Sequence, residues 1–405
     1  MKTVAIVGTL DTKGAEFAFL RAEIERHGCK TLVFDAGVLA APAFPPEVGA
    51  EAICAEVGVS LAALRASGDR GVALDAMARA LPLIVKRHFD EGRFDGIISM
   101  GGGGGTALGT SAMRVLPLGV PKVMVSTVAS GDTGPYVGTS DIVMMPSIVD
   151  VAGVNRISRM VFANAAAAVC GMVNGRQEIP PEATDRPLIA ASMFGNTTRA
   201  VGHARSLLEA RGYEVLVFHA TGTGGRILER LIAEGYFAGV LDLTTTEWAD
   251  EVCGGVLSAG PTRLEAAALA GVPQVVAPAC IDMCNFWAPE TVPARYAGRT
   301  FHHWNPNVTL MRTTPEENAR MGTIFAEKLS AARGPVAVLV PMQGFSEVDA
   351  PGKPFWWPEA DRAFVDALRA ALRPDIPVVL MDHNVNDSEF SREATDRLLG
   401  MLGKE

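Results

Sequence analysis

The sequence predicts an α/β protein with two Rossmann-like, doubly wound domains whose sheets are mainly parallel. The chain has 405 residues, which is too many for one ordinary core and suits about two domains. Short runs that are apolar at every position alternate with amphipathic helical segments, as expected for parallel strands covered by helices on both faces. This alternation stops at a polar stretch near the middle of the chain and then restarts.

The first domain, residues 1–175, contains five predicted strands. They are the apolar runs Val4–Val7, Thr31–Phe34, Gly96–Met100, Lys122–Ser126 and Ile142–Met145. Amphipathic segments such as Ala15–His27 and Ala73–Phe89 are predicted as the helices between them. The alanine-rich segment Asn155–Val173 is expected to end the domain as a long helix.

The second domain, residues 187–405, follows a predicted linker at Asn174–Pro187, which is polar and contains three prolines. Its predicted strands are Leu188–Met193, Glu214–Phe218, Gly239–Leu243, Gln274–Ala277, Val336–Val340 and Pro377–Met381. Both domains open with a strand, a turn, a helix and a second strand that ends in VF. This similarity favours a duplicated module, although convergence on one supersecondary pattern stays open.

Composition and charge exclude several classes of protein. With 48% hydrophobic residues and 20% charged residues, the chain is not disordered. The net charge of −9 argues against a nucleic-acid partner that is bound over a broad surface. Six cysteines without a CxxC pair indicate reduced thiols and a cytoplasmic protein. The apolar start is too short for a signal peptide and no run of about 18 apolar residues occurs, so we expect no membrane partner.

A glycine-rich turn is the strongest candidate for phosphate binding. Gly101, Gly102, Gly103, Gly104 and Gly105 directly follow a predicted strand and precede, with Thr106, a helical segment. Glycine is unfavourable inside strands and helices, so five in a row indicate backbone freedom or a close approach. Free N–H groups at a helix N-terminus bind anions, which predicts a phosphate or nucleotide here. A tight turn packed on a neighbouring strand is the alternative.

The loop after the first predicted strand adds polar groups at the same expected edge of the sheet. The loop begins at Gly8, and the hydroxyls of Thr9 and Thr12 that follow it could donate to a phosphate. Lys13 would neutralise the charge of that phosphate, and Asp11 could hold Mg²⁺. The loop matches neither GxGxxG nor the Walker pattern, since a glycine follows the lysine. Asp11 could instead cap the next helix.

Further candidates for cofactor binding end the second and fourth predicted strands. Asp35 stands where a ribose-binding acid would fall, although a lone acid at a strand end is more often a solvated loop residue. The polar run after the fourth strand contributes Thr127, Ser130, Gly131, Asp132 and Thr133.

Polar and ionisable residues follow several strands of the second domain, which predicts a site at that edge of its sheet. The candidate substrate-binding residues are His219, Thr245, Asp282, Asn285, His302, Arg312 and Lys353. Arg312 and Lys353 would hold an anionic group. His302 and His303 are expected in a loop rich in prolines and aromatics, where the tryptophans are predicted to pack a lid or a subunit contact.

Acid–base chemistry is the leading mechanism for that site. His383 or His303 would be the base, with Asp387, Asp349 or Glu247 as the orienting acid.

Two other mechanisms are less favoured. Metal binding by the histidines lacks an HExxH or HxH spacing, so no metal site is predicted. Ser346 in QGFSEVD could be a nucleophile, but the GxSxG pattern is absent.

Several motifs resemble an uncharacterised protein family that includes the N-terminal domain of the tomato mosaic virus resistance protein, an inhibitor of viral RNA replication. They are GTLDTKG, GGGGGTAL, VSTVASGDTGPYVGTSDI, MFGNTT, GVLDLTTTEWAD, LMRTTPEEN and DAPGKPFWWPEA, and together they span nearly the whole chain. The resemblance implies two Rossmann-like domains, a homodimer and ATP binding at Gly8–Lys13, Gly101–Thr106 and Thr127–Thr133. It implies no reaction, and the antiviral activity does not carry over.

Together these observations predict a cytoplasmic, ATP-binding, homodimeric protein, with Mg²⁺ as a possible companion of the nucleotide. The first hypothesis is an enzyme that acts on a small polar or anionic metabolite. The alternative is a nucleotide-sensing module without turnover. An NAD-dependent oxidoreductase is weaker, because GxGxxG is missing.

Overall fold

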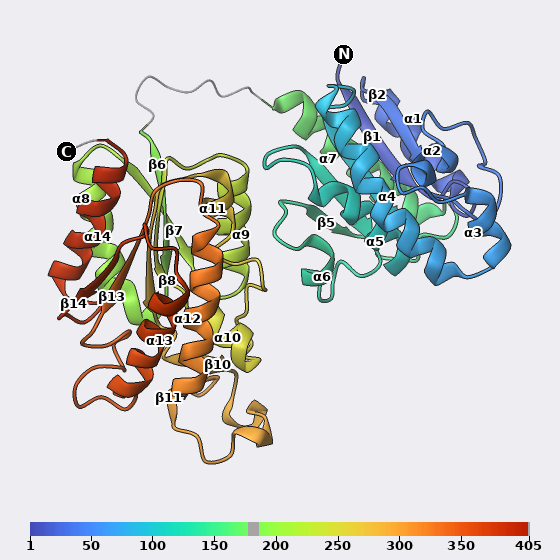
Figure 1. Ribbon diagram of the computed structural model, residues 1–405. Coiled ribbons are helices and arrows are strands. Elements are labelled where there is room, and N and C mark those ends of the chain that lie inside the picture. Colours follow the sequence, from blue (N-terminus) through green and yellow to red (C-terminus); the bar gives the residue numbers. More distant parts are fainter. Residues whose placement is uncertain (177–185, 404–405) are drawn as a thin grey trace. The chain divides into compact units, whose positions relative to one another are not determined.

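A computed structural model of the chain describes residues 1–176 and 186–403 (Figure 1). The chain divides into two compact units, Met1–Pro180 and Pro181–Glu405. Most of the predicted linker, residues 177–185, lies outside the described residues. The predicted fold class is confirmed: each unit is built on a sheet of parallel strands with helices on both faces.

The first unit contains a five-stranded parallel sheet in the order β2-β1-β3-β4-β5. Its strands are β1 (Thr3–Gly8), β2 (Lys30–Asp35), β3 (Gly96–Gly101), β4 (Lys122–Ser126) and β5 (Val143–Pro146). In this order the chain reverses direction across the sheet between β1 and β3. Ligands of doubly wound folds bind at the carboxyl ends of the strands at such a reversal.

Helices cover both faces of this sheet because successive β1 residues point to opposite sides. Val4 and Ile6 pack with α1 (Gly14–Arg26) and α7 (Arg156–Gly175). Ala5 and Val7 pack on the other face, where the larger helices are α4 (Arg70–Asp90) and α5 (Gly103–Arg114). The short helices are α2 (Ala50–Ala55), α3 (Leu61–Ser67) and α6 (Gly134–Val137).

Helix α7 is the one helix among the described residues whose length and apolar composition would let it cross a membrane. Its buried residues, which include Phe162, Val169 and Val173, pack in the same core as α1. The core helix of a globular domain has the same composition, so this feature alone is weak support for a membrane span.

The second unit contains a six-stranded parallel sheet in the order β14-β13-β9-β8-β6-β7. Its strands are β6 (Leu188–Met193), β7 (Glu214–His219), β8 (Gly239–Thr244), β9 (Gln274–Ala279), β13 (Val336–Pro341) and β14 (Val378–Met381). The first five strands of this sheet, counted along the chain, have the same spatial order as the five strands of the first unit. The reversal in this sheet lies between β6 and β8.

Two groups of helices cover this sheet. On one face lie α8 (Thr198–Ala210) and α14 (Ser388–Met401). The other helices are α9 (Thr223–Ala233), α10 (Glu247–Cys253), α11 (Ala266–Ala270), α12 (Pro315–Ser330) and α13 (Pro358–Ala371).

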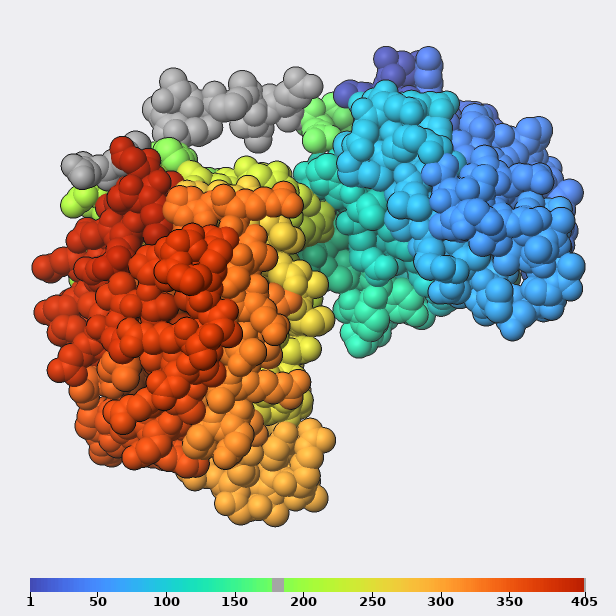
Figure 2. Space-filling view, viewed as in Figure 1, coloured from blue at the N-terminus to red at the C-terminus, as the bar shows by residue number. Residues whose placement is uncertain are grey.

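A small antiparallel sheet, in the order β10-β12-β11, was not predicted from the sequence. It contains β10 (Met283–Phe286), β11 (Phe301–Asn305) and β12 (Val308–Arg312). His302 and His303 were expected in a loop, and that prediction is wrong: they lie on β11, opposite Leu310 and Thr309 of β12. The segment before β12, light orange in Figure 2, projects from the second unit.

Candidate functional site

In the first unit, a cavity of about 420 Å³ lies at the reversal between β1 and β3. We call it the glycine pocket. Its wall is formed by the loop after β1, the start of α4 and the N-terminus of α5, and Asp150 also lines it. Of the predicted cofactor-binding residues, it brings together Thr9, Asp11, Thr12, Lys13, Gly102, Gly103, Gly104 and Gly105.

The glycines of this turn have two different roles. A Cβ atom on Gly101 would lie 2.9 Å from the Cα atom of Gly105, so this pair needs glycine for its close approach. A Cβ atom on Gly103 or Gly104 would have its nearest neighbour at 3.7 Å, an ordinary van der Waals contact, so close packing does not require glycine at these two positions. They begin helix α5, whose first N–H groups have no carbonyl partner within the helix. The turn therefore presents free donors to the cavity.

The loop after β1 is arranged by its own polar contacts. Thr12 Oγ1 donates to Thr9 Oγ1 at 2.9 Å, and Lys13 Nζ donates to the Val151 carbonyl. Asp11 does not cap helix α1: its Oδ2 accepts from the N–H groups of Leu39 and Ala40 at 2.7 and 3.3 Å. Asp11 Oδ1 is buried and has no hydrogen-bond partner among the described residues.

Arg70 is a residue of the glycine pocket that the sequence analysis missed. It is the first residue of α4 and is exposed, and its guanidinium lies 4.0 Å from the position of a Cβ atom on Gly104. No hydrogen bond or ion pair among the described residues engages it. The only signal in the sequence was the helix cap before it, Asp69, whose Oδ1 accepts from Gly71 N–H at 2.7 Å.

Three predicted cofactor-binding residues are buried supports instead of pocket residues. Asp35 Oδ1 accepts from the N–H groups of Leu10 and Gly37 at 3.0 and 2.8 Å, and burial raises the pKa of its carboxyl group. Asp35 therefore holds two loops in place and does not line the cavity where a ribose would lie. Thr106 is fully buried, with its Oγ1 2.6 Å from Ser126 Oγ. A Cβ atom on Gly8 would collide with the Phe17 ring.

The polar run after β4 divides between a cavity and a turn. Thr127 and Ser130 line a neighbouring cavity of about 450 Å³, which shares Asp150 with the glycine pocket. Gly131, Asp132 and Thr133 line neither cavity. They form the turn before α6, in which Asp132 Oδ1 accepts from Gly134 N–H at 3.0 Å.

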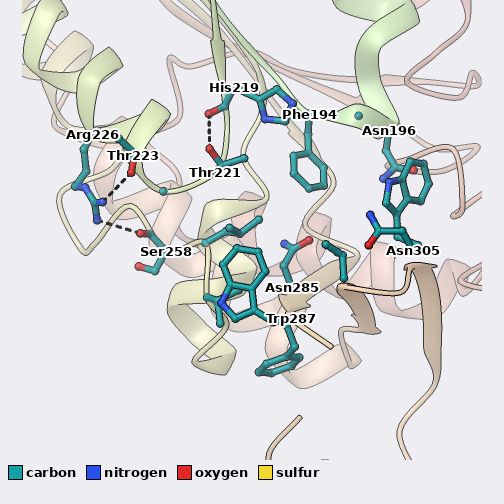
Figure 3. A pocket seen from close by; sticks show the side chains of 17 residues that line it. Phe194, Asn196, His219, Thr221, Thr223, Arg226, Ser258, Asn285, Trp287 and Asn305 are labelled. Carbon is teal, nitrogen blue, oxygen red and sulfur yellow. Dashed lines mark hydrogen bonds between the residues drawn. The ribbon is translucent and has the colours of Figure 1, made fainter. Parts of the chain in front are cut away.

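In the second unit, a cavity of about 590 Å³ lies beside the carboxyl ends of β6 and β7 (Figure 3). We call it the aromatic pocket, because Phe194, Phe286, Trp287 and Trp304 line it. Of the predicted substrate-binding residues, only His219 and Asn285 lie here. The His219 ring packs edge-on against Phe194, with ring centroids 5.6 Å apart.

Glu247, a predicted acid of the acid–base mechanism, belongs to a buried ion network. Its Oε1 accepts from the N–H groups of Gly222 and Gly225 at 2.7 and 3.0 Å, and its Oε2 accepts from Arg263 Nε at 2.7 Å. Arg263 also donates to both carboxylate oxygens of Asp242, at 2.5 and 2.7 Å. Because both oxygens of Glu247 are occupied and the residue is 1% exposed, it cannot orient a catalytic histidine as predicted.

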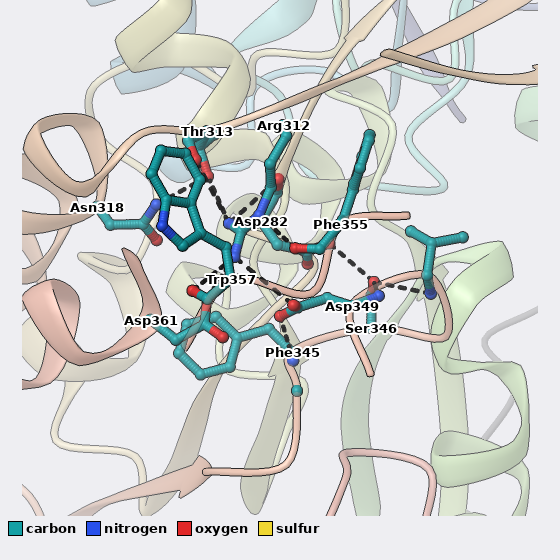
Figure 4. A network of polar contacts seen from close by, with 12 residues as sticks. Asp282, Arg312, Thr313, Asn318, Phe345, Ser346, Asp349, Phe355, Trp357 and Asp361 are labelled. Atoms are coloured by element: carbon teal, nitrogen blue, oxygen red, sulfur yellow. Dashed lines mark hydrogen bonds and ion pairs between the residues drawn. The ribbon is translucent and has the colours of Figure 1, made fainter. Parts of the chain in front are cut away.

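A second buried network surrounds Arg312 (Figure 4). Its guanidinium donates to Asp361 Oδ1 at 2.7 Å and lies 3.5 Å from Asp349 Oδ1. Ser346 Oγ donates to Asp282 Oδ2 at 2.8 Å. Burial, together with the nearby charge of Asp349, raises the pKa of Asp282 to about 7.

This network changes the roles predicted for four residues. Arg312 is 2% exposed and neutralises carboxylates of its own chain, so it does not hold a substrate anion. Ser346, Asp282 and Asp349 are all fully buried, so neither a nucleophile nor an accessible acid is found here.

The remaining predicted residues are spread over the second unit. Thr245 is buried and donates to the Ala277 carbonyl at 2.9 Å. His302 packs beside Trp304 and Phe355, His303 lines a separate shallow cavity, and Lys353 is exposed.

His383 and Asp387 form the one predicted acid–base pair that the structure brings together. Their Nδ1 and Oδ2 atoms are 3.7 Å apart, and both side chains are partly exposed. Neither residue lines the glycine pocket or the aromatic pocket.

Metal binding has little support in the described ranges 1–176 and 186–403. Within them, no group of three or more His, Cys, Asp or Glu side chains is arranged to hold an ion.

The fold and these pockets define a two-unit α/β protein with a glycine-rich crevice in one unit and an aromatic pocket in the other. The chain belongs to the Uncharacterised protein family (UPF0261): the N-terminal domain of the family matches residues 2–178, and the C-terminal domain matches residues 186–402.

Relatives include a UPF0261 protein of Clostridium tetani, 48% identical over the whole length of both chains. The tomato ToMV resistance protein Tm-1(GCR237) is 43% identical over 83% of this chain and 45% of its own length. The family resemblance inferred from the motifs is thus confirmed. A solved UDP-N-acetylglucosamine 2-epimerase from Rickettsia bellii aligns over 99% of this chain and 96% of its own, but with a TM-score of 0.24 and 10% identity.

Proposed function

We propose that the protein binds ATP, accompanied by Mg²⁺, in the glycine pocket of its first unit. The observation that carries this proposal is the open N-terminus of α5 at the reversal between β1 and β3. Free N–H groups and the helix dipole favour a negatively charged phosphate at this position. The cavity of about 420 Å³ lies within the usual size of small-molecule sites.

The other side chains of the pocket suit the same ligand. Lys13 and Arg70 lie in the walls beside the glycine turn and would neutralise phosphate oxygens. The hydroxyls of Thr9 and Thr12 offer further donors. Asp11 Oδ1, buried without a partner, has the charge and chemistry of a Mg²⁺ ligand.

Calorimetric titration tests this proposal with ATP, ADP, AMP and NAD, each with and without Mg²⁺. The Cβ atom added by Gly103→Val would lie 3.7 Å from the Tyr136 hydroxyl, an ordinary contact, so we expect the variant to fold and its side chain to block ATP binding. Lys13→Ala and Arg70→Gln should each weaken binding roughly 10–100-fold, as expected for the loss of a charged hydrogen bond.

Arg79→Gln is the matched control, since Arg79 is an exposed arginine of the same helix α4 outside the pocket. Equal ATP affinity in Gly103→Val and the wild type would disprove the assignment. If no nucleotide binds, the glycine turn is instead a site for the phosphate or carboxylate of another substrate.

A binding module without turnover is the second candidate, and one observation favours it. Among the predicted catalytic residues, Glu247 and Ser346 are committed to internal contacts, which leaves His383 with Asp387 as the acid–base pair for turnover of a small polar or anionic metabolite. Substitution of His383 by alanine separates the two candidates. If the protein is an enzyme, the variant should lose the ATP-dependent turnover of the wild type. If it is a sensor, neither protein should show turnover, and the variant should bind the nucleotide as tightly as the wild type. The homodimer and the cytoplasmic location stay predictions.

A further inference from the structure

The aromatic pocket contains two buried amide oxygens that lack a partner. Asn196 and Asn285 both line it, are 2% and 1% exposed, and each has an Oδ1 atom without a hydrogen bond among the described residues. Buried polar atoms of this kind are rare in folded proteins, because each one loses its bonds to water without replacement. Two of them in one cavity indicate that donors of a ligand complete the site.

The orientation of Asn285 is fixed by its neighbours. Its Nδ2 donates to Asp250 Oδ2 at 2.6 Å, so the amide oxygen is left as an acceptor without a partner among the described residues. The nearest partner of Asn196 Nδ2 is the weakly accepting Met283 Sδ at 3.7 Å. The amide oxygens therefore require a ligand with hydroxyl or amino hydrogens.

Aromatic faces and a positive charge complete the description of the pocket. Trp287 and Trp304 are 50% and 44% exposed, which is unusual for side chains of such large apolar area unless a ligand or partner covers them. Figure 3 places Arg226 and Ser258 at one end of the pocket, Asn305 at the other, and Asn285 and Trp287 between them.

Arg226 is an exposed cation with neutral neighbours only. Its guanidinium donates to the Ser258 carbonyl at 3.4 Å and to Thr223 Oγ1 at 3.3 Å, and no carboxylate among the described residues pairs with it. The N–H groups of Gly222 and Gly225 beside it are already taken by Glu247. Arg226 is therefore the cation that an anionic group at this end would meet, while these two N–H groups are not free to bind it.

We propose that the aromatic pocket is a second ligand site, separate from the nucleotide site, which takes an anionic ring compound that carries hydroxyl or amino donors. The ring stacks on the tryptophans, its donors meet the two amide oxygens, and its phosphate or carboxylate pairs with Arg226. The cavity of about 590 Å³ has room for a phosphorylated sugar or a nucleoside monophosphate, which share this chemistry. This inference does not rest on ATP binding by the first unit.

Tryptophan emission reports on the second unit alone, since all five tryptophans lie from residue 248 to residue 357, and Trp287 and Trp304 line the pocket itself. The probes are glucose 6-phosphate and AMP, each compared with its neutral form, glucose or adenosine. A change in emission with glucose 6-phosphate only would identify a sugar ligand, and a change with AMP only would identify a nucleotide. The phosphorylated probe should bind about 10–100-fold more tightly than its neutral form, because a charged hydrogen bond is added.

Four variants test the named contacts. Arg226→Gln should remove most of the preference for the phosphorylated probe, while Arg199→Gln, an exposed arginine outside the pocket, should keep it. Trp287→Ala should weaken binding about 2–10-fold, the range of aromatic stacking. Tyr236→Ala is its control, because Tyr236 is an aromatic of similar exposure outside the pocket.

Absence of any emission change with both phosphorylated probes at millimolar concentration would overturn the proposal. Equal binding of the phosphorylated and neutral forms would overturn it as well. Calorimetry with ATP on Arg226→Gln keeps the two sites apart: this variant should retain the affinity of the glycine pocket, whatever happens in the second unit.

Discussion

The two units have the same order of their first five strands but differ at the loop after the third of these strands. In the first unit this loop is Gly101–Gly105, which opens helix α5 toward the glycine pocket. In the second unit it is Thr244–Glu247, and all four of these residues are buried. The carboxylate of Glu247 there occupies the free N–H groups at the start of α9, where a ligand anion would otherwise bind.

Strand order therefore brings the loops to one edge of the sheet, whereas the side chains decide whether a cavity is open there. The buried cations of the two units also differ in where they lie relative to the carboxyl edge of their sheet. Lys122 of the first unit lies at the amino end of β4 and pairs with Asp141 at 2.7 Å, away from the carboxyl edge. Arg263 of the second unit pairs with Glu247, directly after β8. Beside the loop after the third strand, the first unit has an open cavity, whereas the second unit places Glu247 and its partner Arg263 in a buried ion network.

The largest effect is expected when the internal charge network of the second unit is broken. Arg263→Leu leaves the carboxylates of Asp242, Glu247 and Glu229 buried without their cation. We expect the free energy of unfolding of this unit to fall by roughly 3–5 kcal/mol. Urea unfolding followed by tryptophan emission measures this unit alone, since the first unit has no tryptophan.

The control for this variant is Arg226→Leu, which removes an exposed arginine and should change the free energy by less than about 0.5 kcal/mol. A loss below about 1 kcal/mol in Arg263→Leu would mean that the network adds little to stability. The buried charges at the edge of the second sheet would then not be explained by a contribution to the stability of that unit.

A pH dependence is the next effect in size. Burial and the neighbouring Asp349 raise the pKa of Asp282 to about 7, so the folded unit binds a proton that the unfolded chain releases above about pH 4. The stability of the second unit should therefore decrease as the pH rises from about 4 to 7, by up to about 1.4 kcal/mol per pH unit for one proton. Asp282→Asn, which imitates the protonated carboxyl group, should flatten this slope.

Free energies of unfolding, measured by tryptophan emission between pH 4 and pH 8, test whether the stability of the second unit falls as the pH rises. Asp366→Asn removes an exposed carboxylate of α13 and should leave the slope as it is in the wild type. A slope that is equally steep in Asp282→Asn would assign the proton to another group, and Asp250 is then the candidate, because burial raises its pKa to about 7 as well.

The parallel strands could be predicted because their apolar runs are continuous and bounded by turns. The predicted Lys122–Ser126 and Leu188–Met193 coincide with β4 and β6. The antiparallel sheet could not be predicted, because MCNF and FHHWN show no regular alternation of apolar and polar residues. Its pairing is set by contacts with β12 instead of by local pattern.

The loops of the candidate site could be predicted, but the roles of single side chains could not. Polar residues after strands mark the edge at which the cavity lies, as Thr9 and Thr12 show in the glycine pocket. Whether such a residue faces a cavity depends on partners far away in the sequence. Arg312 is buried by Asp361, 49 residues further on, and Arg70 reaches the pocket from a helix that no strand precedes directly.

The smallest effect concerns the first unit and checks that the two cores act separately. Asn155 caps helix α7: its Oδ1 accepts from the N–H groups of Ile157 and Ser158, both at 2.9 Å. Asn155→Ala should lower the free energy of unfolding of the first unit by about 1 kcal/mol, whereas Asn155→Asp keeps the acceptor and should remain near the wild type. The first unit has no tryptophan, so we expect the tryptophan-detected transition of the second unit to stay unchanged. Hydrogen exchange of the α7 amides measures the first unit, and equal shifts in both signals would show that the units unfold together.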